Sequence, residues 1–304
     1  MDAEIQRLSD TLIYEIVNAV GLPRSRFWFR VFHPIFHKAA ERMAAIGITL
    51  DRKIAEQGAP LGTGWALTNW CRDLQARGRE NVPPEGPLLV VSNHSGTYDS
   101  FVICSQAGRK DFKAISSDIP FFKNLPHVAE HAIFLTDRTP DRTAAARAGI
   151  RHLQNGGMLL VFGTGLIDPD PAVYPDAERH IERWSPSIDL FLRTVPDLKL
   201  VACIVSGVVS RKWARHPVTW LRRGGVDKRR IAEFGQVLQQ LFRPGSLYLT
   251  PRISFAPPVD AAALRRESNS ERLLPAVIAR GKALLADHCN FFSECAMLKE
   301  RKRR

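Results

Sequence analysis

The sequence predicts an α/β fold: a mostly parallel central sheet with helices on both faces, preceded by an N-terminal helical region. Two observations lead to this prediction. From residue 81 onward, short and continuously apolar runs alternate with longer helical patterns, and strands that are apolar throughout are typical of parallel sheets buried on both sides. The first 80 residues instead contain amphipathic helical patterns and no alternating strand pattern.

The predicted elements follow one another along the chain. Helices are expected at residues 4–20, 26–46 and 63–77, and the segment VPPEGP that follows indicates a linker. The expected strands are 87–92, 112–116, 132–136, 158–162, 199–206 and 247–255. Helices are expected between them at 139–154, 186–194 and 228–242, and the tail 267–297 has a helical pattern. Functional loops should lie at the carboxyl ends of such strands.

The segment RSRFWFRVFHPIFHK at residues 24–38 mixes aromatic and aliphatic side chains with cations. This mixture is typical of a helix in a membrane interface, where rings enter the acyl boundary and cations meet phosphates. The alternative is a helix that docks on the protein core, and Pro34 is expected to kink the helix in either case. The sequence leaves both interpretations open.

The composition limits the class of protein. Of the 304 residues, 45% are hydrophobic, which is enough for a sizeable core. There are 43 Lys and Arg against 31 Asp and Glu, and the formal net charge of +12 favours polyanionic neighbours such as anionic lipids, nucleic acid or an acidic carrier protein. Because no helix-turn-helix, zinc or RNA-binding signature accompanies this charge, no nucleic-acid partner is expected.

Three further features of the sequence bear on location. The five cysteines are scattered without a C-x-x-C pair, which fits a reducing cytosol and predicts no metal site. The N-terminus MDAEIQRLSD is acidic and polar, whereas a signal peptide would be basic and then apolar. No window approaches the ~20 apolar residues that span a bilayer. We therefore expect a cytoplasmic protein, peripheral on the inner face of the membrane.

The candidate for chemistry is the segment NHSGTYD at residues 93–99, directly after the first strand of the α/β region. His94 and Asp99 are five residues apart, and on a regular helix this step would turn their side chains about 140° from each other. A bend is therefore required, and Gly96 is suited to permit it. Folded in this way, Asp99 accepts a hydrogen bond from one ring nitrogen of His94, and the other ring nitrogen is free to act as a general base.

The order of several blocks over roughly residues 85–210 resembles the lysophospholipid and glycerol-phosphate acyltransferase family. NHSGTYD resembles its N-H-x-x-x-x-D block. KAISSDIPFFKNLP, with Lys113, resembles the lysine-led stretch before its second block, and AIFLTDR resembles the second block itself. LLVFGTG stands where the family has a strand followed by F-P-E-G-T-R, and LVACIVSG stands where it has its fourth strand.

The resemblance implies His94 and Asp99 as the catalytic pair. It implies Arg138 as a contact for the acceptor's phosphate, and Arg142, four residues later at the start of a predicted helix, suits the same anion. It implies no bound cofactor and no metal, with acyl-CoA or an acyl-carrier-protein thioester as co-substrate. The full set of expected substrate-binding residues is Asn93, Gly96, Thr97, Lys113, Phe134, Arg138, Arg142, Phe162, Thr164 and Gly165.

The third block departs from the family pattern. Phe162 and Gly165 match, but the family's proline, glutamate, threonine and arginine are replaced by Gly163, Thr164, Leu166 and Ile167. Loss of the arginine removes an expected phosphate contact. In the loop that follows, Asp168 and Asp170 favour turns built on Asp-Pro, with binding of hydroxyls or an amine as the alternative.

These observations predict an acyltransferase with a helical, membrane-associating region at 1–80 and an acyltransferase domain at 81–304 that ends in a helix and a basic tail. The enzyme would move a fatty acyl group from a thioester to a hydroxyl of a lysophospholipid, glycerol-phosphate or related lipid, without an acyl-enzyme. Its expected partners are the lipid acceptor, acyl-CoA or an acidic acyl carrier protein, and a membrane surface. The alternative is a catalytically silent lipid-binding protein of the same fold.

Overall fold

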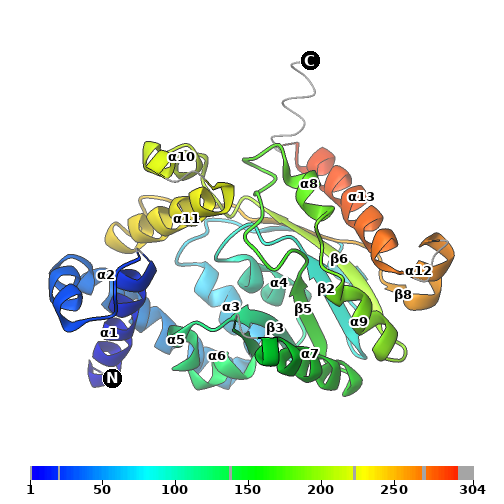
Figure 1. Cartoon of the computed structure of the whole chain (residues 1–304), viewed down its shortest axis with the longest axis horizontal. Helices are drawn as coiled ribbons and strands as arrows, with labels where there is room; N and C mark the ends of the chain where they lie inside the picture. Colours follow the sequence, from blue (N-terminus) through cyan, green and yellow to red (C-terminus); the bar gives the residue numbers. More distant parts are fainter. Residues whose placement is uncertain (1, 20, 137–138, 222–223, 269–271, 294–304) are drawn as a thin grey trace, which may run out of the picture.

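A twisted sheet forms the centre of the molecule (Figure 1). The computed structural model describes residues 2–19, 21–136, 139–221, 224–268 and 272–293. Within them the strand order is β1-β7-β6-β2-β5-β3-β4, and β8 pairs with β6. The strands are β1 (Gln75–Arg77), β2 (Leu88–Ser92), β3 (Phe112–Ser117), β4 (Ala132–Leu135), β5 (Met158–Phe162), β6 (Lys199–Ser206), β7 (Arg252–Phe255) and β8 (Val259–Asp260).

The pairing confirms the predicted mostly parallel sheet. β2 pairs in parallel with both β5 and β6, β3 with both β5 and β4, and β1 with β7. β7 and β8 run antiparallel to β6. Each of the six expected strands is present, although the last begins five residues later than predicted, at Arg252. The two short strands β1 and β8 were not predicted.

Helices cover both faces of the sheet, as predicted. On one side lie α3 (Ala59–Leu67), α4 (Asp99–Ala107) and α11 (Gly225–Phe242), and on the other lie α8 (Ala177–Ile181), α9 (Ser187–Thr194), α12 (Ala261–Ser268) and α13 (Leu274–Phe292) (Figure 1). The remaining helices are α1 (Asp2–Ala19), α2 (Arg26–Gln57), α5 (Pro120–Lys123), α6 (Pro126–Glu130), α7 (Thr139–Gln154) and α10 (Arg211–Ala214), with 3-10 turns η1 (Arg79–Asn81) and η2 (Pro217–Leu221).

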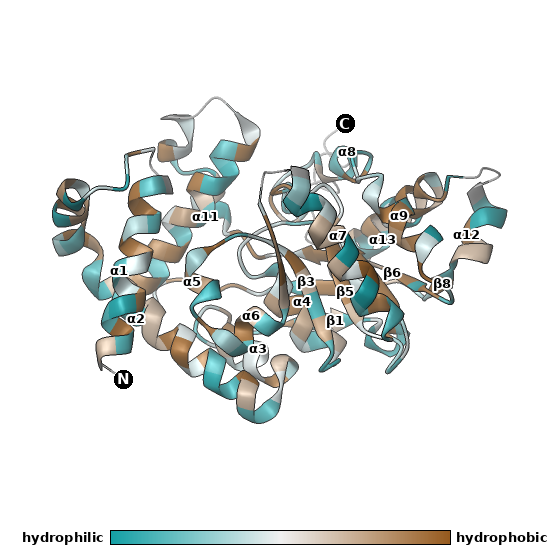
Figure 2. Ribbon diagram, turned by 60° about the horizontal axis from the view of Figure 1, so that its bottom comes forward, coloured by the Kyte–Doolittle hydropathy of each residue, from teal (hydrophilic) through white to brown (hydrophobic). Residues whose placement is uncertain are grey.

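Strand β2 shows why its sequence is apolar throughout. Successive side chains of a strand point to opposite faces, so Leu88 and Val90 enter the core under α3 and α4, whereas Leu89 and Val91 enter the core under α9 and α13. All four side chains are fully buried. Figure 2 shows the same arrangement: the central strands are mostly hydrophobic, and the surrounding helices carry many hydrophilic residues.

The N-terminal region is helical, but two details differ from the prediction. Helix α2 continues to Gln57, eleven residues beyond the predicted end at residue 46, and Pro34 lies inside its first turns. The third helix ends at Leu67, and Gln75–Arg77, expected in that helix, instead forms the edge strand beside β7. Three residues are too few for a strand pattern, and a partner far along the chain determines this pairing. The domain boundary at residue 80 stays a prediction.

The helix pair α1–α2 is attached to the segment between β3 and β4. Leu8 of α1 and Ile48 of α2 share a small core with Phe121 and Leu125. In addition, Glu15 of α1 accepts a hydrogen bond of 2.7 Å from the backbone N–H of Phe121, at the start of α5. A carboxylate at a helix N-terminus is a favourable cap, so these contacts fix the helix pair on the α/β region. No helix among the described residues is long and apolar enough to cross a membrane.

Candidate active site

His94 and Asp99 meet at the carboxyl end of the central strand β2. The turn after Ser92 leads into α4, whose first residue is Asp99, and it brings Nδ1 of His94 within 3.1 Å of Oδ2 of Asp99. The same Oδ2 accepts a hydrogen bond of 2.9 Å from the backbone N–H of Gly96. Asp99 is fully buried, whereas the His94 side chain is 28% exposed. The expected contact is therefore present, and the imidazole is open on one side.

This contact fixes the tautomer of His94. A carboxylate only accepts hydrogen bonds, so Nδ1 carries the proton and Nε2 presents a lone pair. Burial by itself lowers the pKa of His94, but the hydrogen bond and the negative charge of Asp99 outweigh it and hold the pKa above its usual value of 6.5. The result is a base slightly stronger than a free imidazole, with its reactive nitrogen facing away from Asp99.

Gly96 lies where the turn passes close to α11. Its φ angle is not in the left-handed region. A Cβ at this position would instead lie 2.5 Å from Oε1 of Glu233 and 3.3 Å from a methyl group of Val208. A side chain here would therefore displace the Glu233 carboxyl, so glycine leaves room for Glu233 beside the turn.

Asn93 and Ser95 attach the turn to the neighbouring strand β6. The side-chain amide of Asn93 donates to the carbonyl of Val205 at 2.9 Å, and its oxygen accepts from the backbone N–H of Val205 at 2.9 Å. The hydroxyl of Ser95 donates to the same carbonyl at 3.1 Å. Asn93, expected to bind substrate, thus uses its polar atoms within the protein, where they hold the turn that carries His94.

The third block of the sequence forms the wall beside His94. The ring of Phe162, the last residue of β5, stacks on the imidazole with 4.1 Å between ring centroids and an angle of 19°. The next residue, Gly163, has no room for a side chain, since a Cβ would lie 2.2 Å from the indole of Trp184. The packing of Trp184 therefore accounts for glycine at this position, where the acyltransferase family that the sequence resembles has proline.

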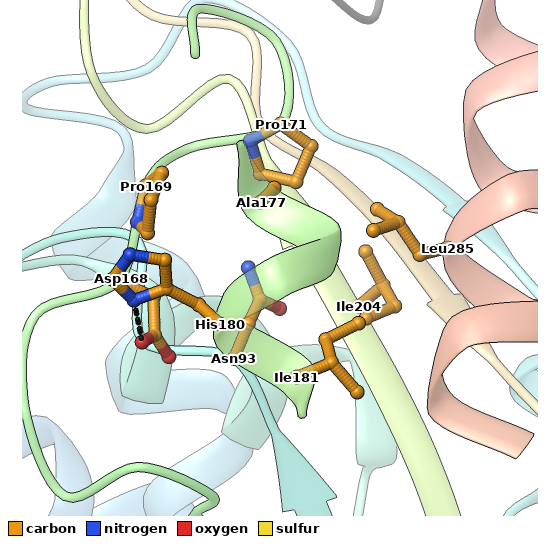
Figure 3. Close-up of a pocket in the computed structure, with 9 residues that line it drawn as sticks. All are labelled: Asn93, Asp168, Pro169, Pro171, Ala177, His180, Ile181, Ile204 and Leu285. Atoms are coloured by element: carbon orange, nitrogen blue, oxygen red, sulfur yellow. Dashed lines mark ion pairs between the residues drawn. The ribbon is translucent and has the colours of Figure 1, made fainter. Parts of the chain in front are cut away.

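Asp168 and Asp170 hold the loop after β5 against the turn. Oδ2 of Asp168 accepts a hydrogen bond of 3.0 Å from the backbone N–H of His94, and the Asp168 N–H donates to the His94 carbonyl at 2.6 Å. The other oxygen of Asp168 accepts from Thr164 and lies 3.4 Å from Nδ1 of His180 (Figure 3). Its role is to support His94, rather than only to form a local turn.

Asp170 is fully buried and anchors the far side of the same loop. Its carboxylate accepts four backbone hydrogen bonds of 2.8–3.0 Å, from Ala172 and from the three residues that follow β6, Gly207, Val208 and Val209. Burial raises the pKa of Asp170 to about 6 although these amide donors lower it. All of its strong acceptor positions are occupied, so the structure gives Asp170 a supporting role.

A narrow pocket lies behind this loop (Figure 3). The side chains that line it come from the turn after β2, from the loop, and from α8, β6 and α13; they are Asn93, Asp168, Pro169, Pro171, Ala177, His180, Ile181, Ile204 and Leu285. His94 does not line this pocket. We therefore do not assign it to a fatty acyl chain.

The other expected site residues fall into two groups. Thr97, Thr164 and Gly165 lie at the carboxyl edge of the sheet near His94; Thr97 is exposed, and Gly165 adopts a left-handed φ of 67°. Lys113 lies near the amino end of β3, paired in register with Leu159, which is about 10 Å along the strands from that edge.

The three remaining positions belong to the second block. Phe134 lies on the edge strand β4, with Nζ of Lys123 over its ring at 5.5 Å, and Arg142 is an exposed residue of α7. Arg138 lies outside the described residues. The structure thus places His94, Asp99, Asn93, Gly96, Thr97, Phe162, Thr164 and Gly165 at the carboxyl ends of β2 and β5. Phe134 lies on β4, three strands away from β2.

Helix α11 contributes functional residues that sequence reasoning missed. One face of this helix is polar yet buried, with Arg229, Glu233, Gln236 and Gln240 at helical spacing. Gln236 binds the backbone of Ser210 and Val208, and Gln240 accepts a hydrogen bond of 2.8 Å from the Tyr98 hydroxyl. The sequence pattern that could have pointed to these residues was this polar stripe. In the sequence it looks the same as an ordinary solvent-exposed helix face.

Glu233 is the member of this stripe that lies against the His94 turn. Its Oε1 is buried without a hydrogen-bond partner. Burial raises the pKa of Glu233 to about 8. The charge of His94 lowers this pKa, the charge of Asp99 raises it, and the backbone of Thr97 acts to lower it. At neutral pH Glu233 is therefore a neutral acid beside the His94–Asp99 pair.

Glu233→Gln is expected to stabilise the protein near neutral pH. The folded protein keeps a proton on Glu233 up to a pH of about 8, whereas an unfolded glutamate releases it at about 4.3. Between these values the wild-type free energy of unfolding should fall as the pH rises, by roughly 1.4 kcal/mol per pH unit from this group, and the variant should lack this loss.

Urea unfolding at pH 5 and pH 8 measures how the free energy of unfolding of each protein depends on pH. The control is Glu130→Gln, which changes an exposed glutamate. Equal pH dependence in all three proteins would contradict the assignment.

No group of three or more His, Cys, Asp and Glu side chains that could hold a metal ion occurs in the part of the chain that the structure describes. Most polar side chains of the site bond to one another or to the backbone, whereas Oδ1 of Asp99 and Oε1 of Glu233 are buried without a hydrogen-bond partner. The arrangement can take a proton from a bound hydroxyl at Nε2 of His94, with Asp99 stabilising the imidazolium that forms.

No known protein-family model matches the sequence, and no curated protein matches it. Among solved structures, the chain is similar to the crystal structure of the 1-acyl-sn-glycerophosphate (LPA) acyltransferase PlsC from Thermotoga maritima, with 16% sequence identity and a TM-score of 0.44. The similarity covers 93% of this chain and 98% of that chain.

Proposed function

We propose that this protein is an acyltransferase that moves a fatty acyl group from a thioester to a lipid hydroxyl. One observation carries the proposal: Asp99 holds Nδ1 of His94 at 3.1 Å, and the imidazole is 28% exposed, with no hydrogen bond to Nε2 from the described residues. A histidine oriented by a buried carboxylate is the arrangement of a general base. The order of sequence blocks around it, which resembles that of glycerolipid acyltransferases, supports acyl transfer as the reaction.

The proposed reaction needs no protein nucleophile. Nε2 of His94 takes the proton of the acceptor hydroxyl as the oxygen attacks the thioester carbonyl carbon. The tetrahedral intermediate then collapses, the carbon–sulfur bond breaks, and the imidazolium returns its proton to the departing thiolate. Asp99 acts as a positioning residue, because its charge stabilises the imidazolium between the two proton transfers. The products are an ester and a free thiol.

We propose that the protein binds its lipid acceptor at a membrane surface. Phe27, Val31 and Ile35 lie four residues apart along α2 and are 66%, 41% and 56% exposed, so they form one outward apolar stripe. The exposed cations Arg26 and Arg30 lie beside this stripe. Apolar side chains flanked by arginines suit an interface with anionic lipids.

The membrane proposal predicts that Phe27→Ser/Ile35→Ser weakens binding to vesicles. Burial of two such side chains contributes about 1.5–3 kcal/mol each, so the partition coefficient should fall at least about tenfold. Cosedimentation with vesicles of phosphatidylcholine and phosphatidylglycerol measures this coefficient. The control is Leu190→Ser, which removes an exposed leucine from α9 on the other face of the sheet. Equal binding by both variants would argue that α2 does not contact lipid.

The enzymatic proposal is tested with purified protein, an acyl-CoA or acyl-carrier-protein thioester, and vesicles containing lysophosphatidic acid, lysophosphatidylcholine or monoacylglycerol. Formation of a new ester together with one equivalent of thiol is the expected result with at least one acceptor. Vesicle binding without ester formation from either donor would favour the silent lipid-binding alternative.

A further inference from the structure

Arg229 is a buried cation with few polar contacts in the protein. It lies in the second turn of α11 and is 9% exposed. Its Nε donates a hydrogen bond of 3.0 Å to the backbone carbonyl of Ile167, in the loop after β5. Among the residues that the structure describes, no carboxylate lies within ion-pair distance of its guanidinium, and its two Nη groups make no hydrogen bond and are reached by solvent.

Such an arrangement is costly for the protein alone. Removing a charged group from water is strongly unfavourable unless the charge is paired and hydrogen-bonded. A guanidinium that uses one donor within the protein and leaves both Nη groups without a hydrogen bond keeps the fork needed for a bidentate contact with an oxyanion. Burial lowers the pKa of Arg229, and nearby negative charges raise it, yet an arginine remains protonated throughout the physiological range.

Arg229 and His94 contact consecutive residues of one loop. Arg229 binds the carbonyl of Ile167, and the next residue, Asp168, exchanges two hydrogen bonds with the backbone of His94. One helical turn after Arg229, Glu233 lies against Gly96, two residues after His94. Two separate connections thus link α11, near Arg229, to the turn that carries His94.

We propose that Arg229 binds a phosphate group of a substrate while His94 acts on that substrate's acyl transfer. The proposal rests on the acyltransferase function. The phosphate has two chemical sources, a phosphate monoester on the lipid acceptor or the phosphodiester of the donor's pantetheine arm. In both cases the Nη groups hold the phosphate oxygens, and the bond between Nε and Ile167 keeps the guanidinium in place.

The acidic groups that face Arg229 do not fill this role. Asp176, Asp168, Tyr174 and Glu233 lie close enough to raise its pKa, but none of the carboxylates makes an ion pair with it within the described residues. The carboxylate of Asp168 is already bonded to His94 and Thr164. Glu233, whose pKa burial raises to about 8, is neutral at pH 7. A bound phosphate would therefore be the partner in direct contact with the guanidinium.

The test is Arg229→Gln, with Arg230→Gln as the matched control. Glutamine can still donate a hydrogen bond toward Ile167, so the loop is kept while the charge is lost. Arg230 is the adjacent residue, equally charged but exposed. Initial rates are measured with palmitoyl-CoA and two acceptors that carry the same acyl chain, lysophosphatidic acid and monoacylglycerol, and thermal unfolding checks that both variants are folded.

With Arg229→Gln, the KM of one phosphate-bearing substrate should rise about tenfold to a hundredfold, the range expected for a charge-assisted contact, and Arg230→Gln should leave it unchanged. A rise in the lysophosphatidic acid KM with no change for monoacylglycerol assigns the phosphate to the acceptor. A rise in the palmitoyl-CoA KM with both acceptors assigns it to the donor.

Unchanged KM values, or an equal loss of kcat for both acceptors with KM unchanged, would overturn the proposal that Arg229 binds a phosphate. Absence of transfer by the wild type would instead refute the acyltransferase function.

Discussion

Replacement of His94 by alanine is expected to lower the kcat for acyl transfer by about 10²–10⁴-fold, the usual contribution of a positioned general base. The reason is that the variant loses Nε2 as the proton acceptor. The fold should survive, because the turn is held by the backbone of His94 and by Asn93 and Ser95 rather than by the ring.

Thiol release measured with a chromogenic reagent at saturating donor and acceptor gives this kcat. His127→Ala is the matched control, since it removes a half-buried histidine of α6 that lies outside the site. Thermal unfolding should give similar midpoints for both variants. A His94→Ala protein with more than about a tenth of wild-type activity would mean that another group removes the proton.

Asp99→Asn is expected to lower kcat roughly tenfold to a thousandfold and to move the acidic limb of the pH profile to lower pH. The rate falls because asparagine no longer fixes the proton on Nδ1 or stabilises the imidazolium. The limb moves because His94 acts as a base only when unprotonated. In the wild type, the charge of Asp99 holds the His94 pKa above 6.5, and without that charge the lowering effect of burial remains.

The measurement is kcat/KM between pH 5 and pH 9 for both proteins, since this quantity reports the ionisation of the free enzyme. The wild-type rate should rise through a pKa above 6.5, and the variant should reach its lower plateau at a more acidic pH. An acidic limb at the same pH in both proteins would show that His94 is not the titrating group or that Asp99 does not act on it.

Most of the fold could be predicted from the sequence because its strands are buried on both faces. The runs that form β2, β5 and β6 are apolar at every position and are separated by helical patterns, so their period and length identified them directly. The two short strands β1 and β8 could not be found in this way. They have three and two residues, and each depends on a partner in another part of the chain.

The site was predictable only where it is local in sequence. His94 and Asp99 lie in one turn, and their contact follows from the bend between them. Glu233 contacts this turn, and Arg229 contacts the loop bonded to it, from a helix that begins more than 120 residues later, and no motif connects them to it. Their burial is decided by which face of α11 packs against the turn after β2 and the loop after β5, and tertiary packing, rather than the sequence pattern, determines that face.

Gly163 illustrates the same limit in the third block. In the sequence it is a departure from a proline, and nothing nearby explains it. The cause is Trp184, twenty-one residues later, whose ring occupies the space of a side chain at that position. Departures of this kind need not alter the chemistry, because Phe162 still stacks on His94 and the loop remains bonded to it.

A single-turnover experiment tests the proposed role of His94 most directly. Protein in excess is mixed with palmitoyl-CoA labelled in its acyl chain, with and without lysophosphatidic acid, and the label in ester, in free fatty acid and on the protein is measured. We expect labelled ester and free coenzyme A to form together only when the acceptor is present, with no label on the protein and almost none transferred by His94→Ala. Label that accumulates on the protein before the acceptor is added, or equal ester formation by His94→Ala, would contradict direct transfer by a histidine base.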